Sequence, residues 1–210
     1  MITKAVDIVA NNNSFHPIID FLEGLTWDGT PRISHMLTHF FGAEDQKYTG
    51  EIMKMHMMAA ISRLYEPGTK YDIMLCLVGG QGTGKSTFFK YLAIKDEWFT
   101  DDMKRLDDKK VYEYLQGHWI VEMSEMNAVA NAKSIEETKS FLSRQKDTYR
   151  IPYERRAEDR YRQCVFCGTS NDLAVGDFWV LRATECDSSL FVSADSNEQL
   201  PKARKCIFGL

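Results

Sequence analysis

The sequence predicts an α/β domain with a largely parallel sheet, preceded by a small helical region. Three short apolar runs have the length and composition of strands buried on both faces of a sheet. They occupy residues 73–78, 118–123 and 164–171. Helical patterns at 87–92 and 135–144 lie between these runs, and such alternation favours parallel pairing. Residues 15–67 instead place apolar side chains three and four positions apart, which is typical of amphipathic helices.

Length and composition favour one main folding unit. With 210 residues, of which 44% are hydrophobic and 27% charged, the chain can bury a substantial core. These values differ from those of disordered or disulfide-rich proteins. We expect a helical region at 1–68, an α/β core at 69–172 and a divergent tail at 173–210. The first two parts are expected to pack together.

No feature of the sequence indicates export or a membrane. The longest apolar run, at 73–78, is far shorter than the roughly 20 residues that a spanning helix requires. The N-terminus lacks a signal-peptide pattern, so we expect a cytoplasmic protein whose five cysteines stay as free thiols. Cys164 and Cys167 form a C-x-x-C pattern, but on a strand they point to opposite faces, which disfavours a shared zinc ion.

A phosphate-binding loop is the most specific motif in the chain. The pattern G-x-x-x-x-G-K-[ST] is matched in full by Gly79-Gly80-Gln81-Gly82-Thr83-Gly84-Lys85-Ser86, between a predicted strand and a predicted helix. Backbone N–H groups of such a loop surround phosphate oxygens at the positive end of the helix. We expect Lys85 to reach the β- and γ-phosphates of ATP and Ser86 to bind Mg²⁺. The whole nucleotide-binding segment is expected to extend through Thr87.

Two carboxylates and an amide come at the ends of the next two predicted strands. The run at 118–123 ends near Glu122, and Glu125 lies just beyond it, so both can face the γ-phosphate. We expect this pair to supply the acidic group that hydrolysis needs, with Glu122 also a ligand of Mg²⁺. Asn171, on the strand expected beside the phosphate loop, is predicted to orient the attacking water. The simpler interpretations are that Glu122 and Glu125 are surface carboxylates at the start of a helix, and that Asn171 is an asparagine in a turn.

A basic segment lies between residues 139 and 162. Its eight basic and four acidic residues give a local charge of +4, although the whole chain carries −4. Tyrosines at 149, 153 and 161 add stacking surfaces, and Ile151-Pro152 indicates a hairpin or an extended loop, so a DNA-binding track is predicted. The residues expected to contact DNA are Lys146, Arg150, Arg155 and Arg156. The alternative is a solvated face in which individual arginines pair with carboxylates.

Six segments together resemble one family. They are His16-Pro-Ile-Ile-Asp-Phe-Leu22, Leu25-Thr-Trp-Asp-Gly-Thr-Pro-Arg-Ile33, the phosphate loop, Gly117-His-Trp-Ile-Val-Glu-Met-Ser-Glu125, Arg150-Ile-Pro-Tyr153 and Gly168-Thr-Ser-Asn171. Over residues 10–172 the chain is similar to the virulence-associated protein E family, which comprises phage and prophage P-loop ATPases related to superfamily 3 helicases.

The resemblance implies a P-loop NTPase fold of AAA+ or helicase type. It also implies ATP-driven work on DNA, most simply single-stranded DNA, by a homo-oligomeric ring that acts with a primase or another replication partner. One alternative is a catalytically impaired nucleotide-binding remnant that acts by association with protein or DNA. Another is a small-molecule kinase, which would share the phosphate loop but needs an acceptor site that the sequence does not reveal.

The resemblance stops after Asn171. Members of the family continue with a segment similar to T-G-N-R-R-F-(F/W)-P-V, whose arginines are candidates to stabilise charge on the γ-phosphate. The genetic code allows residues 181–192 to be encoded so that a neighbouring frame gives T-G-N-R-M-R-F-F-P-V-C. We therefore predict that the chain from about Leu173 onward is a frameshifted, loosely packed tail that lacks those arginines.

Overall fold

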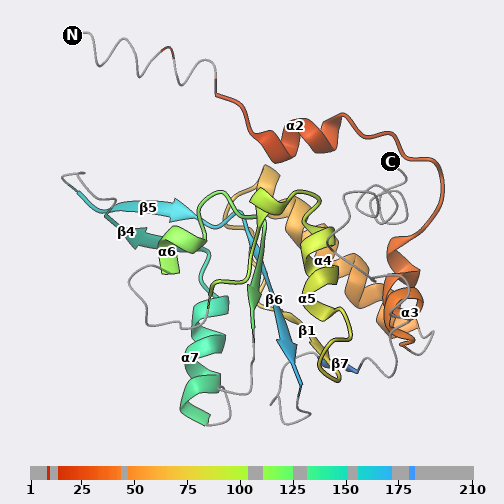
Figure 1. The fold of residues 1–210 in the computed structure, drawn as a ribbon. Coiled ribbons are helices and arrows are strands. Elements are labelled where there is room, and N and C mark those ends of the chain that lie inside the picture. The colour runs from red at the N-terminus through yellow and green to blue at the C-terminus, as the bar shows by residue number, and fades with distance from the viewer. Residues whose placement is uncertain are drawn as a thin grey trace.

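A parallel sheet flanked by helices forms the centre of the protein (Figure 1). The computed structural model describes residues 9, 14–43, 47–103, 111–124, 132–150, 156–171 and 180–182. Within these ranges the sheet has five strands, in the order β2-β3-β6-β1-β7, and every neighbouring pair is parallel. The strands are β1 (Leu75–Val78), β2 (Phe99–Thr100), β3 (Ile120–Met123), β6 (Val165–Ser170) and β7 (Val180–Arg182). The predicted α/β fold is confirmed.

The helical region precedes the sheet, as predicted. It contains α2 (Pro17–Glu23), the 3₁₀ turn η1 (Ile33–His35), α3 (Met36–Phe41) and α4 (Lys47–Tyr65). The start of α2 is fixed locally, because Pro17 takes a first-turn position and the Nδ1 atom of His16 accepts a hydrogen bond from the N–H of Ile19 at 3.4 Å. Gly42 ends α3 in the left-handed conformation, with φ of 59°.

Helices cover both faces of the sheet, and each face has its own core. On one face, residues of α2 to α4 and of α5 (Lys85–Leu92) pack against the odd-numbered positions of β1. The other face is covered by α6 (Val111–Tyr114) and α7 (Ala132–Leu142). In Figure 1, α7 lies to the left of the sheet, and α3, α4 and α5 lie mainly to its right.

Buried polar contacts join the helical region to the sheet. The Nε1 atom of Trp119, just before β3, donates to the carbonyl of Ala60 in α4 at 2.9 Å. The guanidinium of Arg63 donates to the carbonyls of Thr69, Tyr71 and Cys164 at 2.8–3.0 Å. These contacts and the shared core confirm that the two parts pack together. No helix in the described ranges is long and apolar enough to cross a membrane.

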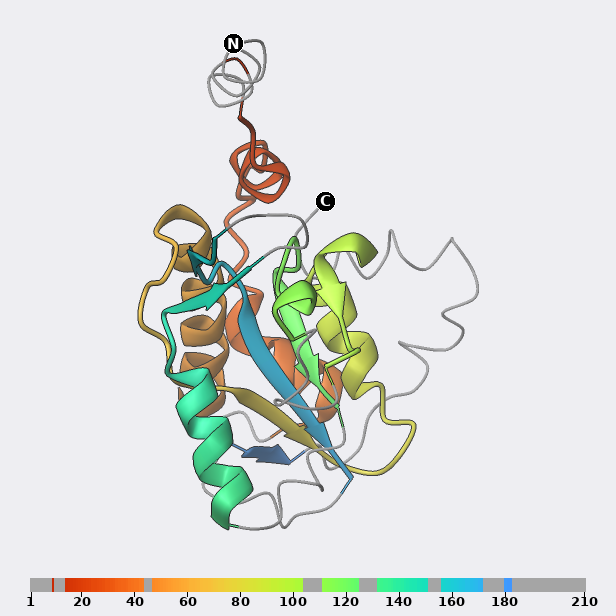
Figure 2. The ribbon, with the colours of Figure 1, turned by 90° about the vertical axis from the view of Figure 1, so that its left-hand side faces the viewer.

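A separate hairpin precedes β6. Its strands, β4 (Lys146–Tyr149) and β5 (Glu158–Tyr161), are antiparallel, which agrees with the hairpin predicted around Ile151-Pro152. Figures 1 and 2 both show the hairpin near the end of the sheet where β6 begins. The phosphate loop lies at the opposite end of the sheet, where β1 and β6 end (Figure 1, Figure 2).

The predicted tail supplies one element of the sheet. Residues Val180–Arg182 form β7, which pairs with Cys76–Val78 of β1 at the sheet edge. A loosely packed segment would not be expected to contribute a strand, so this part of 173–210 differs from the expectation. The remainder of the tail lies outside the described residues, and the frameshift itself stays a prediction.

Candidate nucleotide-binding site

The phosphate loop connects β1 to α5 in the way that its motif predicted. Gly82 and Gly84 have φ of 82° and 75°, in the left-handed region that side chains with a Cβ rarely adopt. The hydroxyl of Thr83 donates to the carbonyl of Gly80 at 2.9 Å, which closes the loop. The N–H of Gly79 donates to the carbonyl of Ser170 at 3.2 Å, so the loop is also tied to the end of β6.

Lys85 occupies the centre of this loop. Its Nζ atom donates to the carbonyls of Gly79 and Gly80, both at 2.8 Å, and to the hydroxyl of Thr83 at 3.3 Å. It also donates to Oδ1 of Asn171 at 3.1 Å. Burial lowers the pKa of Lys85, while the charge of Glu122 opposes this effect. The ammonium group is therefore held inside the loop, on acceptors that phosphate oxygens can replace.

The strand order brings Glu122 to the same place. Because β6 lies between β1 and β3, side chains on one face of β3 and β6 converge beside the start of α5. The Glu122 side chain is fully buried, and its Oε1 atom accepts hydrogen bonds from Ser86 at 2.7 Å and from Thr169 at 2.6 Å. Its Oε2 atom is buried and has no hydrogen-bond partner among the described residues.

The electrostatics of Glu122 follow from this position. Burial raises the pKa of its carboxyl, hydrogen bonds from Thr169 and Ser86 lower it in part, and the charge of Asp101 raises it further. An unpartnered oxygen on a buried carboxylate is costly unless a ligand completes its coordination. Carboxylate and hydroxyl oxygens are the donors that Mg²⁺ prefers, so Ser86 and Glu122 fit the predicted metal ligands.

The structure gathers most of the predicted site residues. Hydrogen bonds join Lys85 to Asn171 and Ser86 to Glu122. Thr87 is half-buried in the first turn of α5, and Gln81 is exposed on the loop. Glu125, the second predicted carboxylate, lies outside the described residues.

Two residues near Glu122 were missed by the sequence analysis. The sequence places Thr169 only within a predicted strand, although its buried hydroxyl donates a hydrogen bond to the Glu122 carboxylate. Asp101 follows β2, which has only two residues and gives almost no periodic signal. The short apolar pair Trp98-Phe99 before Thr100 was the available sign that a strand, and hence an acidic residue at its carboxyl end, occurs there.

The predicted DNA-contacting residues differ in their surroundings. Arg150 and Arg156 are exposed at the end of the hairpin, while Lys146 forms an ion pair with Asp159 on the opposite strand. Arg155 lies outside the described residues. Arg162 instead fits the alternative in which an arginine of this segment pairs with a carboxylate, because it is buried and binds both carboxylate oxygens of Asp147.

The two cysteines of the C-x-x-C pattern lie on opposite sides of the sheet. Cys167 belongs to the core beneath α5, whereas Cys164 belongs to the core on the other face. Both are buried free thiols, and burial raises the pKa of each.

The fold is similar to that of two solved structures. Two apo structures of the NrS-1 C-terminal region align with TM-scores of 0.56 and 0.53, at 17% and 18% sequence identity. Each alignment covers 88% of this chain and 45% of the other, so the protein spans less than half the length of those chains. C. elegans PCH-2 aligns with a TM-score of 0.39 at 14% identity, over 78% of this chain and 51% of its own.

The family assignment rests on the sequence profile. No curated protein matches the chain. The profile of the Virulence-associated protein E-like domain, however, matches residues 22–175. Because this match covers most of the chain, the protein belongs to the virulence-associated protein E-like family, as its motifs predicted.

Proposed function

We propose that the protein binds ATP with Mg²⁺ and hydrolyses it while acting on single-stranded DNA in phage or mobile-element replication. The observation that carries this proposal is the Glu122 carboxylate. One of its oxygens accepts a hydrogen bond from Ser86 of the phosphate loop, and the other is buried without a partner among the described residues. A metal-binding hydroxyl and an acidic group thus meet beside a lysine-containing phosphate loop.

Each residue of the site has a role in this proposal. The N–H groups of the loop and Lys85 bind the phosphates, and Lys85 then exchanges the carbonyls of Gly79 and Gly80 for phosphate oxygens. Bound Mg²⁺, held by Ser86 and Glu122, would neutralise charge on the β- and γ-phosphates. The amide of Asn171, already in contact with Lys85, orients the attacking water. Glu125 accepts the proton of that water.

The DNA part of the proposal is supported by the hairpin. Arg150 and Arg156 are exposed cations of the kind that contact phosphates, whereas Lys146 must give up Asp159 to do so. The hairpin is joined directly to β6, whose far end carries Asn171. β6 therefore connects the proposed nucleotide site to the hairpin. A homo-oligomeric ring and a primase partner remain proposals that follow from the family.

The experiment measures phosphate release from ATP with and without single-stranded DNA. The wild-type protein is expected to turn over ATP faster when DNA is present. Glu122→Gln should keep nucleotide bound and slow hydrolysis by about 100-fold or more. Glu97→Gln is the matched control, because Glu97 is an exposed glutamate that pairs with Lys95. Wild-type turnover that is unchanged by Glu122→Gln would contradict the proposal.

A second candidate is a nucleotide-binding remnant without turnover. It is favoured by one observation: among the described residues, no guanidinium forms a hydrogen bond with Lys85, Ser86, Glu122 or Asn171. Hydrolysis of a phosphoanhydride is strongly accelerated by such a group. Tight ATP binding with no phosphate release would identify the remnant. Phosphoryl transfer to a metabolite, unaffected by DNA, would identify a small-molecule kinase.

A further inference from the structure

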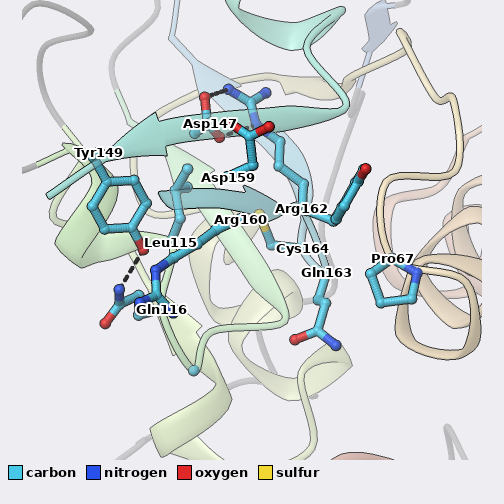
Figure 3. Close-up of a pocket in the computed structure, with 12 residues that line it drawn as sticks. Pro67, Leu115, Gln116, Asp147, Tyr149, Asp159, Arg160, Arg162, Gln163 and Cys164 are labelled. Carbon is cyan, nitrogen blue, oxygen red and sulfur yellow. Dashed lines mark hydrogen bonds and ion pairs between the residues drawn. The ribbon is translucent and has the colours of Figure 1, made fainter. Parts of the chain in front are cut away.

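A pocket lies at the base of the hairpin, away from the phosphate loop. It has a volume of about 420 Å³ and is lined by residues of β4, of β5 and of the segment 115–117 before β3 (Figure 3). This volume is in the range of small-molecule sites, about 300–1,000 Å³. Pro67, Leu115 and Cys164 contribute apolar surface to its lining, while Arg160 and Gln163 supply polar groups.

Most charges around the pocket are already neutralised. Asp147 binds the guanidinium of Arg162, with distances of 2.6 and 2.9 Å. Asp159 pairs with Lys146 and accepts a hydrogen bond from the hydroxyl of Thr148 at 2.6 Å. Because these charges are paired with one another, an uncharged ligand group fits the pocket better than a phosphate does.

Arg160 and Gln163 line the pocket with donors that are available to a ligand. The Nε atom of Arg160 is buried without a hydrogen-bond partner in the part of the chain that the structure describes. Its Nη2 atom is 3.7 Å from a carboxylate oxygen of Glu158, a long ion pair. No hydrogen bond of the Gln163 side chain to another described residue is found. Arg160 extends toward Tyr149 and Gln116 in Figure 3, and its guanidinium carbon lies 5.5 Å from the centre of the Tyr149 ring.

One wall of the pocket is held in place before any ligand binds. The rings of Tyr149 and Tyr112 are stacked, with centroids 4.9 Å apart and an interplanar angle of 8°. The hydroxyl of Tyr149 also accepts a hydrogen bond from the amide of Gln116. A preformed wall lowers the entropy cost of binding a rigid, flat ligand. Tyr161, 58% exposed at the rim, offers a further aromatic surface.

We infer that this pocket binds a nucleobase of single-stranded nucleic acid, an inference that rests on the proposed action on DNA. A base is flat, uncharged and of suitable size, and its acceptor atoms match the donors of Arg160 and Gln163. The exposed Arg150 and Arg156 on the same hairpin would hold the phosphates on either side. The pocket would then supply affinity that depends on the base, whereas the two exposed arginines supply affinity that depends on the backbone charge.

The test compares two fluorescent chains of about 10 nucleotides, one of oligo-dT and one of abasic deoxyribose phosphate. We expect the wild-type protein to bind the base-containing chain at least about tenfold more tightly, as measured by anisotropy. In Arg160→Gln and in Gln163→Ala this preference should fall several-fold, with little change in affinity for the abasic chain. Arg160→Lys keeps the charge without the planar donors and should behave like Arg160→Gln. Arg156→Gln is the matched control, which should weaken binding of both chains equally.

Each outcome decides between the interpretations. Loss of the base preference in the pocket variants, with melting temperatures unchanged, supports the pocket. The inference is overturned if the base preference survives in all pocket variants, or if these variants weaken binding of both chains alike. A protein partner would then be the remaining candidate ligand of the pocket. If the wild-type protein binds neither chain, the DNA part of the proposed function fails together with the pocket. ATP binding, measured separately, then shows whether the nucleotide site still stands.

Discussion

A buried ion pair at the base of the hairpin can be tested by a double-mutant cycle. Arg162 and Asp147 have side chains that are 1% and 3% exposed, and they form two hydrogen bonds of 2.6 and 2.9 Å. The Nη1 atom of Arg162 also donates to the carbonyl of Phe141 at 2.6 Å, and its guanidinium lies 4.3 Å from the centre of that ring. These contacts fix the hairpin to α7.

The expected magnitudes follow from the burial of both charges. Arg162→Met leaves the Asp147 carboxylate buried beside the half-exposed Arg144, which is 4.0 Å away, and should cost about 3–5 kcal/mol. Asp147→Leu should cost a similar amount, because it leaves the guanidinium uncompensated. The double variant should cost much less than the sum, since it leaves no buried unpaired charge, so we expect a coupling energy of about 3 kcal/mol.

Urea unfolding followed by circular dichroism measures these free energies. For a protein of this size, the loss in either single variant corresponds to a decrease in Tm of roughly 10 °C. The control is Lys54→Met with Glu51→Leu, an exposed pair at 3.0 Å whose coupling should be below about 1 kcal/mol. Single Arg162 and Asp147 variants that each cost less than about 1 kcal/mol, with additive effects, would refute the reasoning.

Three further predictions concern pH and the tail. Because the pKa of Glu122 is raised in the folded state, the contribution of this residue to stability is present below about pH 4.5 and is lost as the pH rises. Glu122→Gln should therefore raise the free energy of unfolding at neutral pH but not in acid. Burial lowers the pKa of His56 to about 4, so protonation of this residue should lower the free energy of unfolding by about 3 kcal/mol between pH 6.5 and 4. His56→Gln should abolish this pH-dependent loss. Equal pH dependence of the unfolding free energy in wild type and variant would contradict the prediction. If residues after about 173 are frameshifted, the coding sequence should contain the T-G-N-R motif in the neighbouring frame. Restoring that frame should raise ATP turnover by about 100-fold or more, and unchanged turnover would reject the hypothesis.

The phosphate loop and the three central strands, β1, β3 and β6, could be predicted because their signals are local, whereas β2 and β7 were not predicted. Eight consecutive residues, Gly79 to Ser86, define the loop, and the buried strands before and after it are short apolar runs bounded by glycines. Placing Asn171 beside the loop needed one further rule, that the strand adjoining the phosphate-loop strand carries polar groups at its carboxyl end. The hydrogen bond from Lys85 to Asn171 confirms that placement.

The surroundings of each charged side chain could not be predicted, because they depend on contacts distant in sequence. Lys146 and Arg162 have the same charge and lie in the same segment, yet one forms an exposed pair and the other is buried. Their partners, Asp159 and Asp147, are 13 and 15 positions away, and only the register of the hairpin selects them. The role of Thr169 likewise depends on a strand 47 positions away.

Binding of MgATP is the most direct test of the proposed nucleotide site. In titration calorimetry the wild-type protein should bind one MgATP per chain, and Lys85→Ala should weaken binding by about 10- to 100-fold, because it removes a charge-assisted contact with the phosphates. Lys90→Ala, the exposed lysine on the same helix, should bind like wild type. The account predicts this separation between the two lysine variants at equal thermal stability. Equal MgATP affinity in wild type and Lys85→Ala would contradict it.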